Sequence, residues 1–419
     1  MKTNIDKLIT SPYGATLFPI ILMMLSFAFP SSLYEYLINE PNYMFLNYKI
    51  ITFGMLCILF YYIGVYISNY KPFLHFRLLQ KLKHQHLLIN FKIILAFVII
   101  LQFVYFFFLN IFFYKSLNQN LLEIVFSGRG QLIKDCLGIE IKIPFGIASI
   151  PNYVLGIEFW LIYNLYTFQK GMFDIKNLKY LKLANTLSLI LLVIFNIISV
   201  NRPILIILII GYFVIHSYFR KESVIFNLAK SWFIILLSFV FISILRWSSN
   251  NENLVNLILN RLLGYTIASF NRFALIIDGK LSYVDVGIPK VFYIFPILKI
   301  PLTNIEFHNL LEYSRLSLSA CGNLGLNPDY NMATLFGGIY QSIGIATPIY
   351  FCFLGFIGRR LYISFKNGKT FGIIFYPLFY ASVVLCMIDV NIFIMFFPYF
   401  FYAFLSIVLL KFLFNFLIT

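Results

Sequence analysis

Charged residues are scarce in this chain of 419 residues: only 11% are Asp, Glu, Lys or Arg, while 61% are hydrophobic. Soluble domains carry about a quarter charged residues. A water-soluble fold could not keep so much Phe, Ile and Leu away from solvent. The sequence therefore predicts an integral membrane protein.

The sequence also lacks the short motifs that mark several protein classes. It has no P-loop and no dinucleotide-binding glycine fingerprint, which argues against ATP-driven transport and hydride transfer. Its five cysteines show no metal-ligand spacing. We therefore expect neither a metal nor a cofactor.

Long apolar blocks dominate what is present. A transmembrane helix needs about 20 apolar residues, and about ten blocks approach that length. Because the blocks are continuously apolar rather than alternating, they favour helices over a β-barrel. The predicted fold is all-α, with about ten transmembrane helices near residues 15–36, 48–68, 92–113, 146–169, 182–200, 203–219, 229–247, 335–357, 371–388 and 391–414.

The net charge of +16 indicates the orientation. With a cytoplasmic N-terminus, the inner connections hold most of the 32 basic residues but only Asp6, Asp174 and Glu222 among the 16 acidic ones. Basic residues accumulate in cytoplasmic loops, so both termini are expected in the cytoplasm. The basic excess thus reflects orientation, and we expect no nucleic-acid partner.

Two outer connections are too long to be simple turns, and they set the predicted domain organisation. Residues 1–247 would hold seven spans and a first periplasmic loop at 114–145. Residues 248–334 would form a large periplasmic loop subdomain, and 335–419 the last three spans. Loops of this length are usually functional or disordered, and amphipathic patterns in the second favour an ordered, functional one.

Arginines on the expected outer side are candidate anion-binding residues. Arg202 precedes Pro203 in a tight turn at a helix start, where the helix dipole and a cation together favour an anion. The alternative is an arginine that reaches lipid headgroups. Arg129 lies in a Ser-Gly-Arg-Gly-Gln segment, whose exposed backbone N–H groups suit phosphate, although a plain turn fits equally well.

The segment 254–275 has a helical period that carries two further arginines. Arg261, Tyr265 and Arg272 are spaced by four and seven residues. In an α-helix both arginines would share one face, about 16 Å apart. One helix could then present two cations to an anionic ligand; the alternative is a basic face in contact with headgroups or solvent.

A candidate general base lies further along the second loop. His308, Glu312 and Arg315 are spaced by four and three residues, which places them on one stripe of a helix. His308 is the histidine expected on the outer side, so it is the candidate base, oriented by Glu312. The alternative is a solvated polar helix face.

Glu158 is an acidic residue within the fourth predicted span, and we expect it near the outer end of that span. Carboxylates at membrane depth usually face a cavity or a basic partner. Arg202 or Arg129 is a candidate partner, and a structural ion pair fits as well as a catalytic role.

Together these features lead to a family resemblance. The end of the second loop and the eighth span read Asn327-Pro-Asp-Tyr-Asn-Met-Ala-Thr-Leu-Phe-Gly-Gly-Ile-Tyr340-Gln-Ser-Ile-Gly344. With Arg202 at a short outer turn and two large arginine-bearing loops, the chain resembles the Wzy-type O-antigen (oligosaccharide repeat-unit) polymerases. The family often has Asp-Phe where Ser342 and Ile343 stand, so no acid is assigned there.

The resemblance implies a GT-C-like glycosyltransferase of the bacterial inner (cytoplasmic) membrane. Such an enzyme transfers the growing glycan from undecaprenyl pyrophosphate to the non-reducing end of a lipid-linked repeat unit at the periplasmic face, without cofactor or metal. Expected partners are membrane lipids and a chain-length regulator and flippase of the same pathway. The implied roles are pyrophosphate binding by Arg202, Arg261, Arg272, Arg315 and Arg129, catalysis by His308 and Glu312, and support by Glu158, Tyr265 and Tyr340.

Two other functions are alternatives to a polymerase. An O-antigen ligase would use the same donor with a lipid A-core acceptor, and loop layout separates the two poorly. A lipid-linked oligosaccharide flippase usually has more spans, short loops and charges inside the bundle. The long outer loop and the sparse intramembrane charge count against a flippase.

Overall fold

The computed structural model describes residues 8–69, 91–130, 132–133, 150–168, 175–199, 201–220, 223–247, 254–281, 322–327, 330, 334–387 and 392–418. Within these ranges the chain is helical and contains no β-strand, as predicted. The helices in chain order are α2 (Pro12–Ala15), α3 (Leu17–Ala28), α4 (Ser31–Ile38), α5 (Tyr48–Ile67), α6 (Phe91–Leu117), α7 (Leu121–Phe126), α9 (Ile150–Phe168), α10 (Ile175–Ile198), α11 (Arg202–Phe219), α12 (Val224–Trp247), α13 (Leu254–Leu263), the π-helix η3 (Gly264–Ala268), α14 (Ser269–Ile277), α16 (Leu335–Ile343), the 3-10 helix η6 (Gly344–Ala346), α17 (Thr347–Lys366), α18 (Thr370–Val384) and α19 (Ile392–Ile418).

Several of these helices are long and apolar enough to cross a membrane. Among the described residues there are five of them, α5, α6, α10, α11 and α12, or up to six if the bent pair formed by α2–α3 and α4 counts as one span. The structure therefore supports a helical membrane protein. It does not establish the predicted count of about ten spans.

The first predicted span, 15–36, is not one straight helix. It is broken between Ala28 and Ser31, where the chain bends by 103°. Pro30 causes the break, because a proline disfavours helical geometry in the residue before it; Phe29 is indeed extended, with a ψ of 119°. Helix α4 therefore leaves the direction of α3.

The eighth predicted span, 335–357, is also interrupted. Helix α16 ends at Gly344, whose φ of +57° and ψ of −132° are accessible essentially to glycine alone. Pro348 then sits in the first turn of α17, a position that suits its fixed φ. The described end of the resemblance motif, Leu335 to Gly344, thus lies on a short helix and a break instead of a single span.

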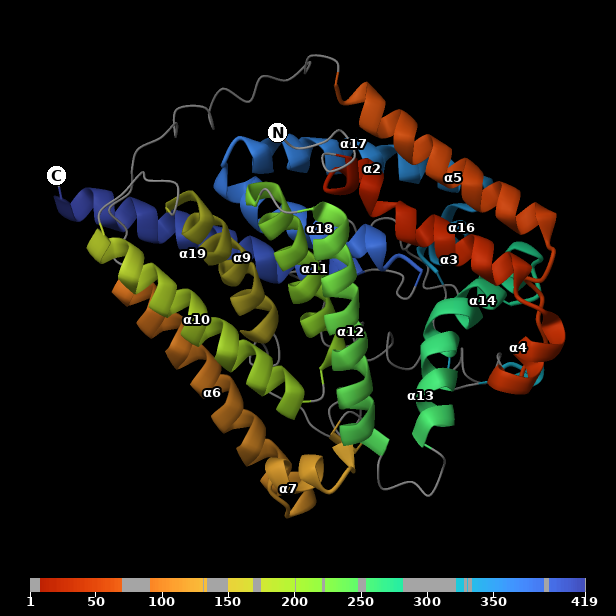
Figure 1. Ribbon diagram of the computed structural model, residues 1–419, viewed down its shortest axis with the longest axis horizontal. Helices are drawn as coiled ribbons and strands as arrows, with labels where there is room; N and C mark the ends of the chain where they lie inside the picture. The colour runs from red at the N-terminus through yellow and green to blue at the C-terminus, as the bar shows by residue number, and fades with distance from the viewer. Residues whose placement is uncertain are drawn as a thin grey trace.

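One end of the bundle gathers the connections that were predicted to be periplasmic. We call it the α7 end; it comprises α7, the C-terminal ends of α6, α10 and α12, and the N-terminal end of α11. These parts share a hydrophobic cluster that includes Phe113, Val125, Phe195, Leu205 and Ile242. Figure 1 shows α7 beneath the lower ends of α6 and α12.

The longest described part of the predicted loop subdomain, 254–281, packs into the bundle. Phe270, Phe273, Ala274 and Ile277 on α14 belong to the main hydrophobic core, which they share with α5, α16 and α17. Helix α14 contacts α16, α3 and α5. This part of the chain is therefore joined to the membrane helices, and the assignment of residues 248–334 as a whole to a subdomain stays a prediction.

Helices α5 and α17 approach each other closely through glycine. An ideal Cβ at Gly64 would lie 1.8 Å from the carbonyl oxygen of Cys352, and one at Gly355 would lie 2.0 Å from the carbonyl oxygen of Tyr61. Neither site accepts a side chain without separating the helices. Small residues at helix contacts allow this close packing in membranes.

We expect Gly355→Ala to destabilise the protein by about 1–3 kcal/mol or more, because the added methyl group overpacks the α5–α17 contact. The measurement is the midpoint temperature of unfolding in detergent. Gly322→Ala is the control, since nothing lies within 4 Å of its ideal Cβ. Equal midpoints for the two variants would contradict the close contact.

Candidate functional site

Arg202, the first residue of α11, points into the protein along α12. Its side chain is buried, and its Nη2 donates a hydrogen bond to Ser243 Oγ at 3.0 Å. Its guanidinium carbon lies 4.5 Å from the centroid of the Phe239 ring. Both partners are on α12, so the structure does not show Arg202 reaching out to lipid headgroups.

Arg261 lies near Arg202 and is connected to it by aromatic rings. Its guanidinium carbon is 5.5 Å from the centroid of the Tyr330 ring. The ring of Tyr265 stands edge-on to Tyr330 at 6.2 Å and to Phe239 at 6.4 Å between centroids. The structure therefore brings together three predicted residues, Arg202, Arg261 and Tyr265.

The sequence interpretation missed a third arginine of this group, Arg246. It lies in the last turn of α12, is buried, and together with Arg261 acts electrostatically on Arg202. The available signal was its position at the end of an apolar block, one turn after Ser243. We call Arg202, Arg246, Arg261, Phe239, Tyr265 and Tyr330 the arginine–aromatic cluster.

The arginine–aromatic cluster is suited to a ligand with several negative charges and ring-shaped groups. Arg246 on α12 and Arg261 on α13 both lie within electrostatic range of Arg202 on α11, and a guanidinium group can donate paired hydrogen bonds to phosphate oxygens. Aromatic rings offer flat apolar faces as well as phenol groups. Tyr265 lies in the π-helix η3, an element often found at functional sites.

Arg272 does not join the cluster, although its spacing from Arg261 suggested a shared face. The five π-helical residues of η3 lie between them and change the angular relation that an uninterrupted α-helix would give. Arg272 is fully buried and pairs with Glu40 through two hydrogen bonds of 2.9 Å. Its charge is thus compensated within the protein.

Glu40 is the centre of a buried network that no sequence pattern indicated. Its Oε1 accepts from Tyr34 Oη, from Asn271 Nδ2 at 3.1 Å and from Arg272 Nη1. Its Oε2 accepts from Arg272 Nη2 and from the backbone N–H of Asn327, both at 2.9 Å. Arg272 Nη2 also donates to the Asn327 carbonyl at 2.9 Å. The network ties α14 to the α4–α5 connection and to residue 327.

Arg129 and Tyr340 lie apart from the arginine–aromatic cluster. Arg129 is exposed after α7, and its Nε donates to Ser127 Oγ at 3.0 Å. Tyr340, on α16, lines a surface cavity of about 460 Å³ with Lys49, Phe53 and other residues of α5. The structure thus gives neither residue a contact with the other predicted groups.

Glu158 also differs from expectation. It sits in the middle of α9 instead of near an end, and it is fully buried. Neither Arg202 nor Arg129 pairs with it, and both carboxyl oxygens are without a hydrogen bond among the described residues. The predicted ion pair is therefore wrong.

His308, Glu312 and Arg315 lie outside the described residues. Their roles stay predictions. Among the described residues, no group of His, Cys, Asp and Glu side chains is arranged to hold a metal ion.

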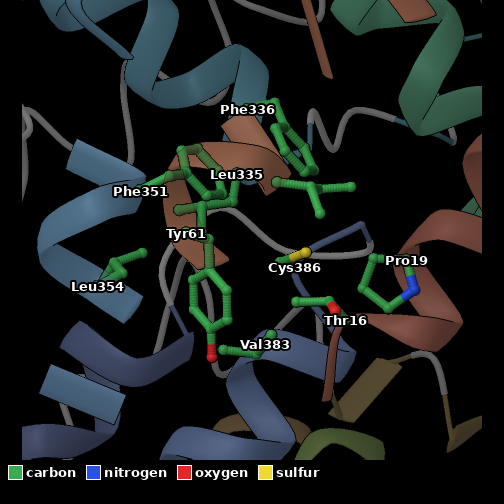
Figure 2. A pocket seen from close by; sticks show the side chains of 10 residues that line it. Thr16, Pro19, Tyr61, Leu335, Phe336, Phe351, Leu354, Val383 and Cys386 are labelled. Carbon is green, nitrogen blue, oxygen red and sulfur yellow. The ribbon is translucent and has the colours of Figure 1, made fainter. Parts of the chain in front are cut away.

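A small cavity lies between α3, α5, α16, α17 and α18, and Figure 2 shows the side chains around it. Its volume is about 20 Å³, and its lining is apolar, with Phe336, Phe351 and Cys386 among the residues around it. This space admits nothing larger than a water molecule. It is a packing defect of the core and not a substrate site.

The chemistry of the arginine–aromatic cluster has to be judged from its own residues. No protein-family model matches the chain, and neither curated proteins nor solved structures give a significant match.

The Glu40 network generates a stability prediction. Glu40→Ala should cost about 3–5 kcal/mol, because it leaves the Arg272 charge buried without its partner. Replacing both residues by leucine should recover most of that loss. Thermal unfolding of the purified protein measures both effects.

Asp278→Asn is the matched control for the Glu40 variants. It breaks the exposed Lys49–Asp278 pair of 3.0 Å, and exposed pairs contribute only about 0–1 kcal/mol. A Glu40→Ala protein as stable as the Asp278→Asn protein would contradict the structural role of the network.

Proposed function

We propose that this chain is a polysaccharide repeat-unit polymerase of the bacterial inner membrane. It would transfer the growing glycan from undecaprenyl pyrophosphate to the non-reducing end of a lipid-linked repeat unit on the periplasmic side. The observation that carries the proposal is that Arg246 and Arg261 lie within electrostatic range of the buried Arg202, and that Arg261 contacts Tyr330 beside Tyr265. The resemblance to Wzy-type polymerases supports it, and a GT-C-like architecture with about ten spans is part of the proposal.

The reaction needs positive charge where pyrophosphate departs. When the glycosidic bond to the lipid pyrophosphate breaks, negative charge grows on the leaving oxygen, and preorganised cations stabilise it. Buried guanidinium groups do so more strongly than exposed ones, because fewer water molecules screen them. Arg202 and Arg246 are both buried.

The position of the arginine–aromatic cluster also supports a lipid-linked substrate. Arg202 begins α11 and Arg246 lies in the last turn of α12, so both are at the α7 end of the bundle. The charge pattern predicts that this end is periplasmic. A pyrophosphate held there could keep its polyprenyl tail in the bilayer while its sugars face the aqueous side.

The acceptor hydroxyl needs a group that removes its proton. In the proposal His308 is that base, Glu312 orients it, and Arg315 and Arg129 add positive charge to the periplasmic loops. Tyr265 and Tyr330 would lie against sugar rings. No nucleotide sugar, metal or cofactor enters the proposed reaction.

The proposal is tested in a strain that lacks the gene, with lipopolysaccharide separated by gel electrophoresis. Deletion should leave lipid A-core with a single repeat unit, and the wild-type gene should restore the ladder. Arg202→Ala, Arg246→Ala and Arg261→Ala should each reduce polymerisation by about 10²–10³-fold, the usual effect of removing one charge-stabilising donor. Immunoblots of membranes verify equal protein levels.

Arg359→Ala is the matched control. Arg359 also makes a side-chain hydrogen bond, to Asn69 Oδ1 at 2.8 Å, and lies on α17 outside the cluster. It should leave the ladder intact. A full ladder from all three cluster variants would overturn the assignment. After deletion of the gene, long chains held on the lipid carrier would instead indicate a ligase. Unsubstituted core without such chains would indicate a flippase.

A further inference from the structure

Glu158 is a fully buried carboxyl group in the middle of α9, with 0% of its surface exposed. Helix α9 is surrounded by α6, α10, α11, α18 and α19. Neither oxygen of the carboxyl group has a hydrogen-bond partner among the described residues. The proposed polymerase reaction does not use this group.

Polar side chains of α10 and α6 lie around Ser188, the residue that interacts with Glu158. Ser188 interacts with the carboxyl group, and Asn185 lies three residues earlier on the same side of α10. Gln102 on α6 donates from Nε2 to the Ser188 carbonyl at 3.3 Å. All three side chains are buried.

These neighbours share a chemical feature: each has an oxygen that accepts no hydrogen bond. Ser188 Oγ, Asn185 Oδ1 and Gln102 Oε1 are all without a partner among the described residues, like the two oxygens of Glu158. Asn185 Oδ1 and Gln102 Oε1 can only accept a hydrogen bond, whereas Ser188 Oγ can accept or donate one.

No described basic group compensates the carboxyl group, since Glu158 has no ion pair or hydrogen bond in the structure. Lys411 Nζ donates to Thr370 Oγ1 at 2.7 Å, and Arg202 donates to Ser243. The ionisable groups described on the five surrounding helices are Tyr105, Tyr114 and Lys115 on α6, Lys179, Tyr180 and Lys182 on α10, Arg202, Tyr212, His216 and Tyr218 on α11, Tyr376 and Tyr380 on α18, and Tyr399, Tyr402 and Lys411 on α19.

An ionised Glu158 would be strongly disfavoured here. A buried charge without a partner costs many kcal/mol, and such a group instead becomes neutral. A carboxylic acid carries one O–H donor, which can pair with one of the acceptor oxygens nearby.

We propose that Glu158, with the acceptor oxygens of Ser188, Asn185 and Gln102, forms a proton-binding site inside the membrane-embedded bundle. The carboxylate takes one proton from water, and the resulting acid donates its O–H to Ser188 Oγ. The proton links α9 to α10. Its release requires water to reach the site, so proton exchange is coupled to the packing of α6, α9 and α10.

Infrared spectroscopy of the full-length protein in detergent tests the site at neutral pH. The expected result is a carbonyl-stretch band of a protonated carboxylic acid that shifts in D₂O. Glu158→Gln, a neutral replacement of the same shape, should remove a band equivalent to one acid per chain. Glu35→Gln is the matched control, since Glu35 is exposed on α4, and it should leave the band unchanged.

A second variant keeps the proposal testable if Glu158→Gln does not fold. Ser188→Ala retains the carboxyl group but removes its acceptor, so the carbonyl band should move to higher frequency. Three results would overturn the site. They are the absence of an acid band at neutral pH, the same band in wild type and in Glu158→Gln, and an unmoved band in Ser188→Ala. Loss of the band on addition of Na⁺ at constant pH would overturn it too, because the group would then bind a metal cation.

Discussion

The ion pair between Arg272 and Glu40 is the interaction on which the arrangement of the candidate site depends. Five hydrogen bonds converge on the Glu40 carboxylate, and they come from α4, α14 and Asn327. Removing two charges from water is costly, so such a pair contributes specificity more than net stability. The pair and its hydrogen bonds therefore hold α14, the α4–α5 connection and residue 327 in fixed positions relative to each other.

That arrangement determines where the arginine–aromatic cluster forms. Helix α14 continues backwards through η3 into α13, so fixing Arg272 also places Tyr265 and Arg261. On the other side, Asn327 is three residues from Tyr330, whose ring packs against Gly264 so closely that a Cβ there would lie 2.0 Å from it. The buried network therefore positions both the cation and the ring of the Arg261–Tyr330 contact. The proposed pyrophosphate site is thus built on a rigid support, which is what transition-state stabilisation requires.

The sequence predicted the helical class and most helix positions because long apolar runs are a strong, local signal. It failed where a single residue overrides the run, as at Pro30 and Gly344, which break two predicted spans. It placed Arg202, Arg261 and Tyr265 on the candidate site, but not Arg246, which carries no motif of its own. The pairing of Arg272 with Glu40 joins residues far apart in the chain, and the π-helix η3 changes the phase between Arg261 and Arg272. Neither feature has a periodic signature, and so neither could be read from spacing.

The most direct test of the proposed function uses the purified protein in proteoliposomes, with an undecaprenyl-pyrophosphate-linked repeat unit as the only sugar source. The account predicts a ladder of lipid-linked chains longer than one unit, with release of undecaprenyl pyrophosphate and no requirement for a nucleotide sugar or added metal. Folded protein that leaves the lipid-linked unit unchanged under these conditions would contradict it.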